Sequence, residues 1–301
     1  MREKVFEVII VGGSYAGLSA AMALGRSLRK VLIIDSGNPC NKQTPHSHNF
    51  ITQDGSTPAQ IAAKAKEQVL SYNTVTFYNG FAVHGFKDTD GFTIQTASGE
   101  SFTARKLVLA TGVKDILPEI PGFAECWGIS AIHCPYCHGY EVRNEPTGIL
   151  GNGEYGFEFS KLINQWTKNL TLYTNGPSTL TVEQTQMLRR HKIEINEAEI
   201  ESLDHKAGKL QNLVARNGST FPVKAIYSRP AFSQHSDIPK QLGCAFTEHG
   251  HLSADMFQKT SVPGVFACGD NVTMMRSVAS AVYTGSMAGS MANKELIEDD
   301  I

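Results

Sequence analysis

The chain has 301 residues and a nearly balanced charge, with 27 Lys and Arg against 29 Asp and Glu. A chain of this length suggests about two domains and buries enough surface to fold without disulfide or metal staples. The charge balance argues against a nucleic-acid or membrane-surface protein, because such proteins usually carry a basic excess or patch. Charged residues make up 19% and apolar residues 41%, which excludes a disordered chain.

The apolar runs and the cysteines indicate a compartment. No stretch reaches about 18 consecutive apolar residues, so we expect a soluble, cytoplasmic protein without a membrane span. A disulfide framework is not expected in such a chain, and only Cys134 and Cys137 lie close together. They form Cys-Pro-Tyr-Cys, a pattern typical of redox or metal chemistry. The six cysteines are Cys40, Cys126, Cys134, Cys137, Cys244 and Cys268.

In chain order, the first predicted elements are a strand, a glycine-rich turn, a helix and a second strand. Residues 5–11 form an apolar run typical of a buried parallel strand. The turn from Gly12 to Gly17 has the sequence GGSYAG and precedes a helix of small residues over 18–24. A strand over 30–34 follows and ends at Asp35.

A second helix and a group of short strands come next. Thr57 and Gln60 form a capping box with Pro58 at the first helical position, which predicts a helix to about residue 72. Residues 106–110 form another apolar strand. Between 75 and 103 the pattern is one of short strands separated by hairpin signals, namely Asn79-Gly80, Asp90-Gly91 and Ser98-Gly99.

The same order of elements recurs after a hinge at residues 118–122. The turn from Gly151 to Gly156, with the sequence GNGEYG, stands between a strand over 147–150 and a helix over 157–166. Later segments predict a strand over 170–173, a helix over 182–191, a hairpin meander over 200–227, a hinge near 229–230 and a long helix over about 277–296. The order predicts an α/β fold of two Rossmann-like, three-layer dinucleotide-binding domains, each with a β-meander, the second inserted into the first.

The two glycine-rich turns differ in their expected ligands. A turn between strand and helix lets phosphates approach backbone N–H groups, and the acid Asp35 can bond a ribose hydroxyl. Ser14 takes the place of the usual second glycine, and a tight turn without a ligand is the alternative. The second turn has Gly151, Gly153 and Gly156, but its second strand ends without an acid or an Arg pair. This second turn could bind NADPH or NADH, or it could be a degenerate nucleotide site.

Cys134 and Cys137 have the spacing of a pair that opens and closes a disulfide at a helix start. There the helix N-terminus lowers a thiol pKa, and Pro135 removes an N–H that would lack a partner. His138 could hold the proton exchanged with the leaving thiol. Zinc is the alternative, with His133 as a further ligand. Adjacent residues rarely serve one tetrahedral site, however, and we expect no metal.

These motifs together resemble the low-molecular-weight thioredoxin reductase family of flavin-dependent pyridine nucleotide-disulfide oxidoreductases. The resemblance covers essentially the whole chain and includes Ala110-Thr111-Gly112 and Gly269-Asp270. It implies FAD held by the terminal segments, a homodimer, and a domain rotation that alternates access to the flavin. The implied bounds are 1–117 with 230–301 for the FAD-binding domain, and 118–229 for an NAD(P)-binding-like domain that carries the CxxC pair.

The resemblance also implies roles for individual residues. Cys137 would face the isoalloxazine, and Cys134 would be the interchange thiol that attacks a substrate disulfide. Asp270 would contact the ribityl chain, and Ser277 and Val278 the pyrimidine end of the flavin. The full set of expected FAD positions is Gly12, Gly13, Ser14, Ala16, Gly17, Asp35, Ser36, His48, Asn49, Val83, Ala110, Thr111, Gly112, Gly269, Asp270, Ser277 and Val278.

Three departures from the family pattern bear on the activity. His138 replaces the usual Asp after the second cysteine, the His-Arg-Arg that reads NADPH is absent, and Arg276-Ser277 replaces Arg-Gln. The CxxC-His-Gly context, with His46 and His48, is similar to the dithiol oxidases of the gliotoxin and holomycin pathways, which pass electrons through FAD to oxygen. Both histidines are open between a flavin-edge role and simple packing.

The predicted function is an FAD-dependent thiol-disulfide oxidoreductase that exchanges electrons among a substrate, the Cys134–Cys137 pair and the flavin. Its partner would be a thioredoxin-like protein or a small-molecule dithiol or disulfide. The direction is open between NAD(P)H-driven reduction and oxygen-driven dithiol oxidation without NADPH, and a protein donor such as ferredoxin is a further possibility. Alternatives from another class are a non-catalytic flavin or nucleotide sensor and a zinc-binding module.

Overall fold

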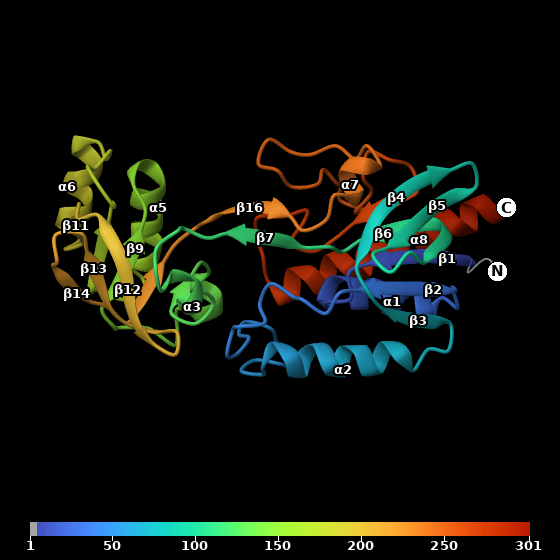
Figure 1. The fold of residues 1–301 in the computed structure, drawn as a ribbon, viewed down its shortest axis with the longest axis horizontal. Coiled ribbons are helices and arrows are strands. Elements are labelled where there is room, and N and C mark those ends of the chain that lie inside the picture. The colour runs from blue at the N-terminus through green and yellow to red at the C-terminus, as the bar shows by residue number, and fades with distance from the viewer. Residues whose placement is uncertain (1–4) are drawn as a thin grey trace. The chain divides into compact units, whose positions relative to one another are not determined.

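The computed structural model describes residues 5–301, and the chain passes between two units (Figure 1). The first unit holds the described residues up to Lys42 together with 56–114 and 232–301, and the second holds 43–55 and 115–231. Two strands that pair with each other, β7 (Val113–Ile116) and β16 (Ala231–Gln234), lie where the chain passes from one unit to the other.

The segment 43–55 belongs to the second unit, although the sequence placed it within the first domain. The Gln43 amide donates hydrogen bonds to the backbone carbonyls of Ala124 and Trp127, at 3.3 and 3.0 Å. Gly128 leaves the space in which Thr44 packs, since a Cβ at Gly128 would lie 3.1 Å from Oγ1 of Thr44. These contacts join residues about 80 positions apart, and no local pattern in the sequence announces them.

The first unit is built on a sheet in which β6 joins a parallel part to an antiparallel part. The order is β3-β2-β1-β6-β5-β4, and β17 pairs with the last residues of β6. β1 contributes Val8, Ile9 and Ile10, which are all fully buried, as its apolar run predicted. The strands are β1 (Val5–Val11), β2 (Val31–Asp35), β3 (Val75–Asn79), β4 (Ala82–Asp88), β5 (Gly91–Thr96), β6 (Ser101–Leu109) and β17 (Val265–Ala267).

One of the predicted hairpin turns is wrong. β3 pairs in parallel with β2, with Val75 opposite Val31, so Asn79-Gly80 ends an edge strand and does not reverse the chain. The next strand, β4, lies at the other edge of the sheet. The predicted turns at Asp90-Gly91 and Ser98-Gly99 are confirmed, since β4, β5 and β6 pair in antiparallel order.

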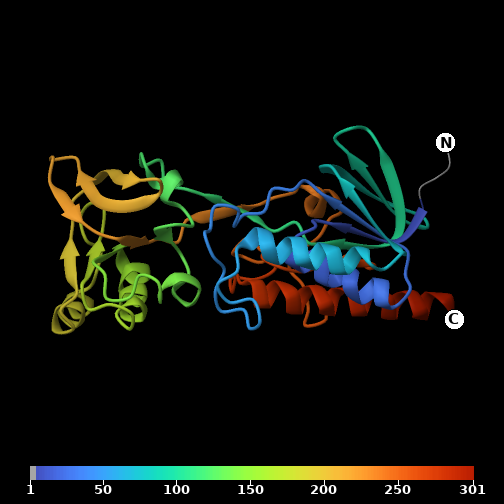
Figure 2. The same cartoon turned by 90° about the horizontal axis from the view of Figure 1, so that it is seen from below.

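Three long helices of the first unit pack beside its sheet, and α1 lies along α8 (Figures 1 and 2). The predicted capping box is present at the start of α2, where Thr57 accepts from the backbone N–H of Gln60 at 3.2 Å. Ser277 accepts from the N–H of Ser280 and so caps α8. The helices are α1 (Tyr15–Arg26), α2 (Pro58–Leu70), α7 (Ile238–Gln241) and α8 (Val278–Asp300).

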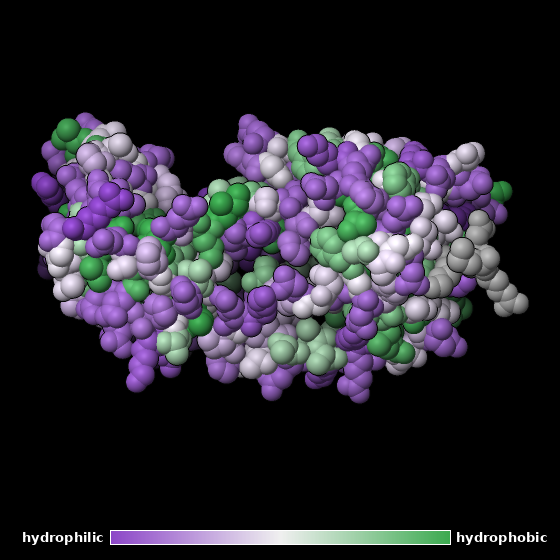
Figure 3. Space-filling view, viewed as in Figure 1, coloured by the Kyte–Doolittle hydropathy of each residue, from purple (hydrophilic) through white to green (hydrophobic). Residues whose placement is uncertain are grey.

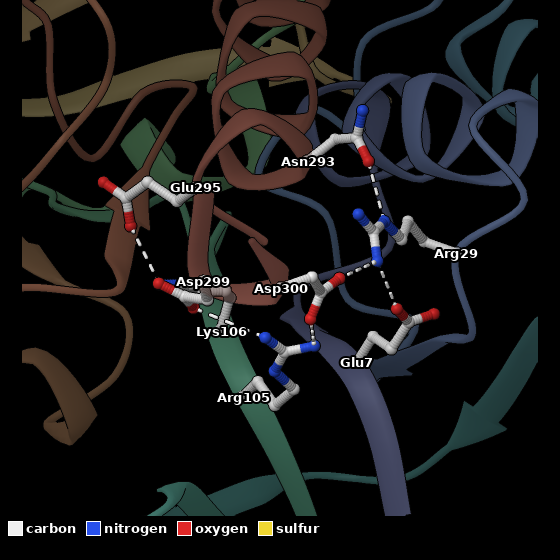
Figure 4. Close-up of polar contacts among 8 residues, drawn as sticks. All are labelled: Glu7, Arg29, Arg105, Lys106, Asn293, Glu295, Asp299 and Asp300. Atoms are coloured by element: carbon white, nitrogen blue, oxygen red, sulfur yellow. Dashed lines mark hydrogen bonds and ion pairs between the residues drawn. The ribbon is translucent and has the colours of Figure 1, made fainter. Parts of the chain in front are cut away.

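Charged side chains of β1, of β6 and of the segment that follows α1 hold the end of α8 (Figure 4). Arg29, whose side chain is only 14% exposed, pairs with Glu7 at 2.6 Å and with Asp300 at 3.3 Å. Its Nε donates to Asn293 at 2.7 Å. Four further ion pairs join the same helix end to β6. Arg105 pairs with Asp300 at 2.7 Å and with Asp299 at 3.6 Å, and Lys106 pairs with Glu295 and Asp299 at 3.1 and 3.0 Å.

The second unit has a parallel sheet between a helical layer and an antiparallel meander. The sheet order is β11-β10-β9-β15-β8, and β12, β13 and β14 form the meander. Ile149 and Leu172 pack toward the helices with Leu188, whereas Tyr173 packs with Leu213 of the meander. The elements are α3 (Phe123–Cys126), β8 (Ala131–Ile132), α4 (Pro135–His138), β9 (Thr147–Leu150), α5 (Gly153–Ile163), β10 (Leu170–Tyr173), α6 (Val182–Arg190), β11 (Glu194–Asn196), β12 (Ile200–Lys206), β13 (Lys209–Ala215), β14 (Thr220–Pro222) and β15 (Ala225–Tyr227).

The visible surface is mostly hydrophilic, with apolar residues scattered in small groups (Figure 3). Within residues 5–301, no helix combines the length and the apolar character that crossing a bilayer requires. The architecture confirms the predicted α/β class with two Rossmann-like layered units.

Candidate active site

The first glycine-rich turn is a close junction between β1, β6 and α1. Gly12 has φ of +106°, and a Cβ there would lie 2.2 Å from the carbonyl oxygen of Ala110. A Cβ at Gly17 would lie 1.8 Å from the carbonyl oxygen of Gly12. Both positions therefore require glycine, because any side chain would push the turn away from the strand ends.

The same turn offers polar groups for a dinucleotide. Ser14 is the N-cap of α1, yet its side chain makes no capping bond. The first N–H groups of a helix lack partners within the helix and suit a phosphate. Asp35 accepts from the N–H of Gly13 at 2.8 Å and from the N–H of Gly37 at 3.1 Å, which orients its carboxylate at the end of β2. Ser36 follows it and is exposed.

The end of β17 adjoins this turn through a residue that the sequence reasoning missed. Asn271 is fully buried, and its amide donates to the carbonyl of Leu109 at 2.9 Å and to the hydroxyl of Thr111 at 3.3 Å. The N–H of Gly269 donates to Thr284 of α8 at 3.0 Å. The predicted motifs 110–112 and 269–270 are thereby brought together, and the only signal for Asn271 is its place directly after Asp270.

Other predicted cofactor residues have different surroundings. Asp270 accepts from Arg276 Nε at 3.4 Å and from the thiol of Cys40 at 3.9 Å. Val83 lies in β4, where its carbonyl accepts from Gln241. His48 and Asn49 belong to the second unit, and the first turn belongs to the first. Among the predicted residues of the first unit, the three glycine-containing motifs and the start of α8 fit a bound FAD.

The Cys134–Cys137 disulfide lies in the second unit at a short helical turn. Cys134 is the N-cap of α4, Pro135 opens the helix as predicted, and the Cα atoms of the two cysteines are 5.3 Å apart. The N–H of Cys137 donates to Sγ of Cys134 at 3.1 Å. A negative charge on Cys134 would be stabilised by this N–H, which suits a thiol that exchanges with a substrate. Cys126, Cys244 and Cys268 are buried thiols outside this disulfide.

His138 follows the disulfide in a cluster that includes the segment 43–55. Burial lowers the pKa of His138; Glu141 raises it and His48 lowers it. His48 lies 3.5 Å from Glu141 through Nε2 and 3.5 Å from Asp54 through Nδ1. The lowered pKa keeps the imidazole of His138 neutral near pH 7, the state in which it can accept a proton. His46 instead contacts the carbonyl of Gly55, at 2.9 Å.

The second glycine-rich turn is filled by the protein's own groups. Asn152 Oδ1 accepts from the N–H of Gly153 and from the N–H of Thr179, both at 2.8 Å, and from the Thr179 hydroxyl at 3.1 Å. Its amide nitrogen donates to the carbonyls of Thr174 and Pro177, at 3.4 and 2.9 Å. One of the N–H groups at the start of α5 therefore already has an acceptor.

Side chains next to this turn add further obstacles to a nucleotide. A Cβ at Gly151 would lie 2.6 Å from the ring of Tyr155, which folds back over the turn. Glu154 places a negative charge in the first turn of α5. Arg189 and Arg190 end α6, and a helix that starts at the carboxyl edge of a parallel sheet ends at the opposite edge. The second glycine-rich turn and the residues around it therefore do not fit a nicotinamide dinucleotide in the usual manner.

Metal ligands do not gather in the described part of the chain, in which no three His, Cys, Asp or Glu side chains are placed to hold an ion. His133, the extra zinc ligand considered from the sequence, stacks on Trp127 with ring centroids 5.7 Å apart.

Comparisons with known proteins agree with this geometry. The chain matches the pyridine nucleotide-disulphide oxidoreductase family over residues 6–285. It is 32% identical to "Thioredoxin reductase tcpT" of Claviceps purpurea, covering 98% of this chain and 95% of that protein. An oxidoreductase structure from Agrobacterium tumefaciens is 34% identical with a TM-score of 0.91, covering 97% of this chain and 98% of that one. A putative thioredoxin reductase structure from Bacillus anthracis is 27% identical with a TM-score of 0.94, covering 98% and 100%.

The matched family, the two Rossmann-like units and the CxxC disulfide carry one conclusion. The family's enzymes use FAD and a pyridine nucleotide, and the first turn of this chain fits the flavin nucleotide. The chain belongs to the pyridine nucleotide-disulphide oxidoreductase family and is a thioredoxin reductase-like disulfide oxidoreductase.

Proposed function

We propose that this enzyme oxidises small-molecule dithiols and that oxygen, in place of a nicotinamide nucleotide, is its other redox partner. The observation that carries the proposal is the second turn, where Asn152 binds the N–H groups of Gly153 and Thr179. A reductase driven by NADPH needs that turn for the pyrophosphate. Overall, the dithiol and O₂ would become a cyclic disulfide and hydrogen peroxide.

The exchange at the cysteines balances in two displacements. A substrate thiolate attacks Sγ of Cys134, the Cys134–Cys137 bond breaks, and Cys137 leaves as a thiolate. The second substrate thiolate then attacks the mixed disulfide, which closes the substrate ring and releases Cys134 as a thiolate. The N–H of Cys137, which donates to Cys134 Sγ at 3.1 Å, supports Cys134 as the exchanging sulfur.

The two thiol protons need acceptors, and His138 is placed to take one. It follows Cys137 directly in the chain, and burial lowers its pKa so that it is neutral near pH 7. Glu141 stabilises the imidazolium once it has formed, and the proton can then leave to solvent. We include Cys134, Cys137 and His138 as the catalytic residues of the proposal.

FAD, once bound, would supply the two-electron acceptor that restores the disulfide and returns the electrons to oxygen. The residues of this chain that would hold it are the turn from Gly12 to Gly17, Asp35, the segment 110–112, and Gly269 with Asp270. The start of α8, at Ser277 and Val278, would favour negative charge at the flavin. Ser36, His48, Asn49 and Val83 remain predicted contacts.

A cytoplasmic location and a homodimer complete the proposal. The thiols of Cys126, Cys244 and Cys268 support a reducing compartment, because cysteines tend to form disulfides in oxidising ones. The homodimer rests on the family resemblance, and sedimentation of the holoenzyme at two concentrations tests it.

Anaerobic mixing of the purified holoenzyme with dithiothreitol, NADPH or NADH tests the direction of electron flow. We expect dithiothreitol to bleach the flavin absorbance and neither nicotinamide nucleotide to do so at a comparable rate. Admitting air should restore the colour and release one equivalent of hydrogen peroxide per dithiol. Fast bleaching by NADPH, with slow bleaching by dithiothreitol, would instead support a disulfide reductase.

A further inference from the structure

Two tyrosine side chains close to the disulfide in the chain are exposed, although the residue directly before each of them is buried. Tyr136 is 58% exposed and Tyr140 is 65% exposed, whereas Pro135 and Gly139 are buried. Exposed aromatic rings lose favourable burial, so a pair of them beside reactive sulfurs indicates a binding surface. We call Tyr136 and Tyr140 the tyrosine pair.

The ring of Tyr136 is held in place by contact with Trp166. Its ring meets Trp166 edge-on, with centroids 5.5 Å apart and an interplanar angle of 88°. Trp166 can come this close because Gly139 has no side chain, since a Cβ there would lie 2.9 Å from the indole and 2.5 Å from the carbonyl of Pro135. The ring is therefore exposed but positioned, which lowers the entropy cost of using it to bind a ligand.

Tyr140 is also fixed on one side. The guanidinium of Arg143 lies 3.9 Å from its ring centroid, and Nη1 of the same arginine donates to the carbonyl of Tyr140 at 2.6 Å. The guanidinium covers one face of the ring. The ring as a whole nevertheless stays more than half exposed.

Both rings lie close to the disulfide along the chain. Tyr136 lies inside the CxxC motif, and Tyr140 follows it by four residues along helical backbone that includes Gly139, with φ of −67° and ψ of −29°. Residues four apart on a helical turn are neighbours on one side of it. Cys137 lies between them in the chain and is half-buried.

We propose that the tyrosine pair receives the flat, apolar body of the dithiol substrate and so selects aromatic or similarly planar dithiols over aliphatic ones. The inference rests on the proposed function, because it assigns a substrate class to the same disulfide. The offset or edge contacts that aromatic rings prefer would hold the body of such a substrate close to the Cys134–Cys137 disulfide.

The size of the surface favours a small molecule over a protein. Two tyrosines exposed to this degree offer on the order of 250 Å² of ring surface. A protein partner ordinarily covers about 800 Å² on each side. The neighbours Glu141 and Arg143 are exposed and oppositely charged, so the apolar area does not extend past the two rings on this turn.

The test compares two dithiols that differ in the ring, namely 1,2-benzenedimethanethiol and dithiothreitol. The measured quantity is the ratio of their second-order rate constants for anaerobic flavin bleaching. We expect the native enzyme to prefer the aromatic dithiol and Tyr136→Leu to reduce that ratio about fivefold to tenfold. Tyr140→Leu should reduce it less, because Arg143 already covers one face of that ring. Tyr136→Phe should keep the ratio, since the ring and not the hydroxyl makes the contact.

Met187→Ala is the matched control, since Met187 is an exposed apolar residue on α6 of the same unit and should leave the ratio unchanged. An unchanged ratio in Tyr136→Leu, whether both rate constants stay the same or fall equally, would overturn the proposal. The redox-inert 1,2-benzenedimethanol separates it from the proposed function. Ligand-observed NMR should detect this diol on the native enzyme and show weaker binding to Tyr136→Leu, even if neither dithiol is turned over. No difference in diol binding would also count against the tyrosine pair.

Discussion

Gly285 of α8 lies directly against the backbone of Ala16 in α1, so that a Cβ at Gly285 would be 2.1 Å from the Ala16 carbonyl oxygen. Ala16 belongs to the glycine-rich turn that we assign to FAD. Gly285→Ala should force the two helices apart, because backbone cannot move aside as a flexible side chain can. We expect a loss of about 2–3 kcal/mol in the free energy of unfolding and release of FAD during gel filtration, measured by urea titration and by the flavin absorbance that remains.

Ser286→Ala is the control for this change. Ser286 is the next residue of α8 and is exposed, so the substitution adds no contact and slightly favours helix. It should leave both stability and bound flavin unchanged within error. Equal behaviour of the two variants would mean that α1 and α8 are not packed as closely as the structure has them.

The acid limb of the activity should follow the charges around His138. Burial lowers the pKa of His138, Glu141 raises it and His48 lowers it. Because the base form must be neutral, the rate of dithiol exchange should fall as pH drops through this lowered pKa. Glu141→Gln removes a charge that favours the imidazolium, so the acid limb should move to lower pH. His48→Gln removes a charge that opposes it, so the limb should move to higher pH.

Rates of anaerobic flavin bleaching by dithiothreitol, measured from pH 5 to 8, would give these limbs. His138→Gln should lower the rate about a hundredfold and lose the limb altogether. A limb that keeps its position in both the Glu141 and the His48 variants would remove His138 from the proposed role.

The sequence predicted the local parts of this fold better than the distant ones. Capping by Thr57, the turn at Gly12 and the N-cap position of Cys134 are each decided by a few neighbouring residues, and all three are present. Asn79-Gly80 misled the prediction because the same dipeptide can close a hairpin or end a parallel edge strand. Only the partner of β3, which is β2, distinguishes the two.

In the candidate site, too, the sequence predicted local features better than contacts between distant residues. The cysteine pair and His138 could be found from their spacing in the chain. The approach of His48 to Glu141 joins residues that are 93 positions apart, at 3.5 Å, and depends on how the segment 43–55 packs. The self-binding of Asn152 likewise depends on Thr179, which a turn motif read as GxGxxG leaves out.

Asn152→Ala should destabilise the second unit without creating a nicotinamide site. The side chain accepts three hydrogen bonds and donates two, and its loss leaves the N–H groups of Gly153 and Thr179 to water. We expect a cost of about 2 kcal/mol in the free energy of unfolding. NADPH should still fail to bleach the flavin, because Glu154 keeps a negative charge at the start of α5.

Asn152→Asp keeps the accepting oxygen and should cost less than the alanine variant in the same urea titration. If Asn152→Ala instead gained rapid reduction by NADPH, the carboxamide would be a simple plug over an intact nucleotide site. The proposed preference for oxygen would then rest on this one side chain.

Arg29 should contribute more than Arg105 to the charged cluster at the end of α8, because its side chain is the more enclosed of the two arginines bound to Asp300. It is 14% exposed and contacts Glu7, Asn293 and Asp300 (Figure 4). Arg29→Met should cost about 2–3 kcal/mol in thermal unfolding of the holoenzyme, since it leaves Glu7 partly buried without its partner. Lys294→Met is the control, because the Lys294–Glu298 pair is exposed and 3.7 Å apart. It should change stability by less than about 0.5 kcal/mol.

Arg105 and Arg29 lower the pKa of Asp300. The contribution of Asp300 to stability should therefore be present above the ordinary carboxyl pKa and be lost as pH falls through the lowered pKa. A cost for Arg29→Met that stays the same at high salt and low pH would show that the methylene packing of Arg29, and not its charge, holds α8 in place.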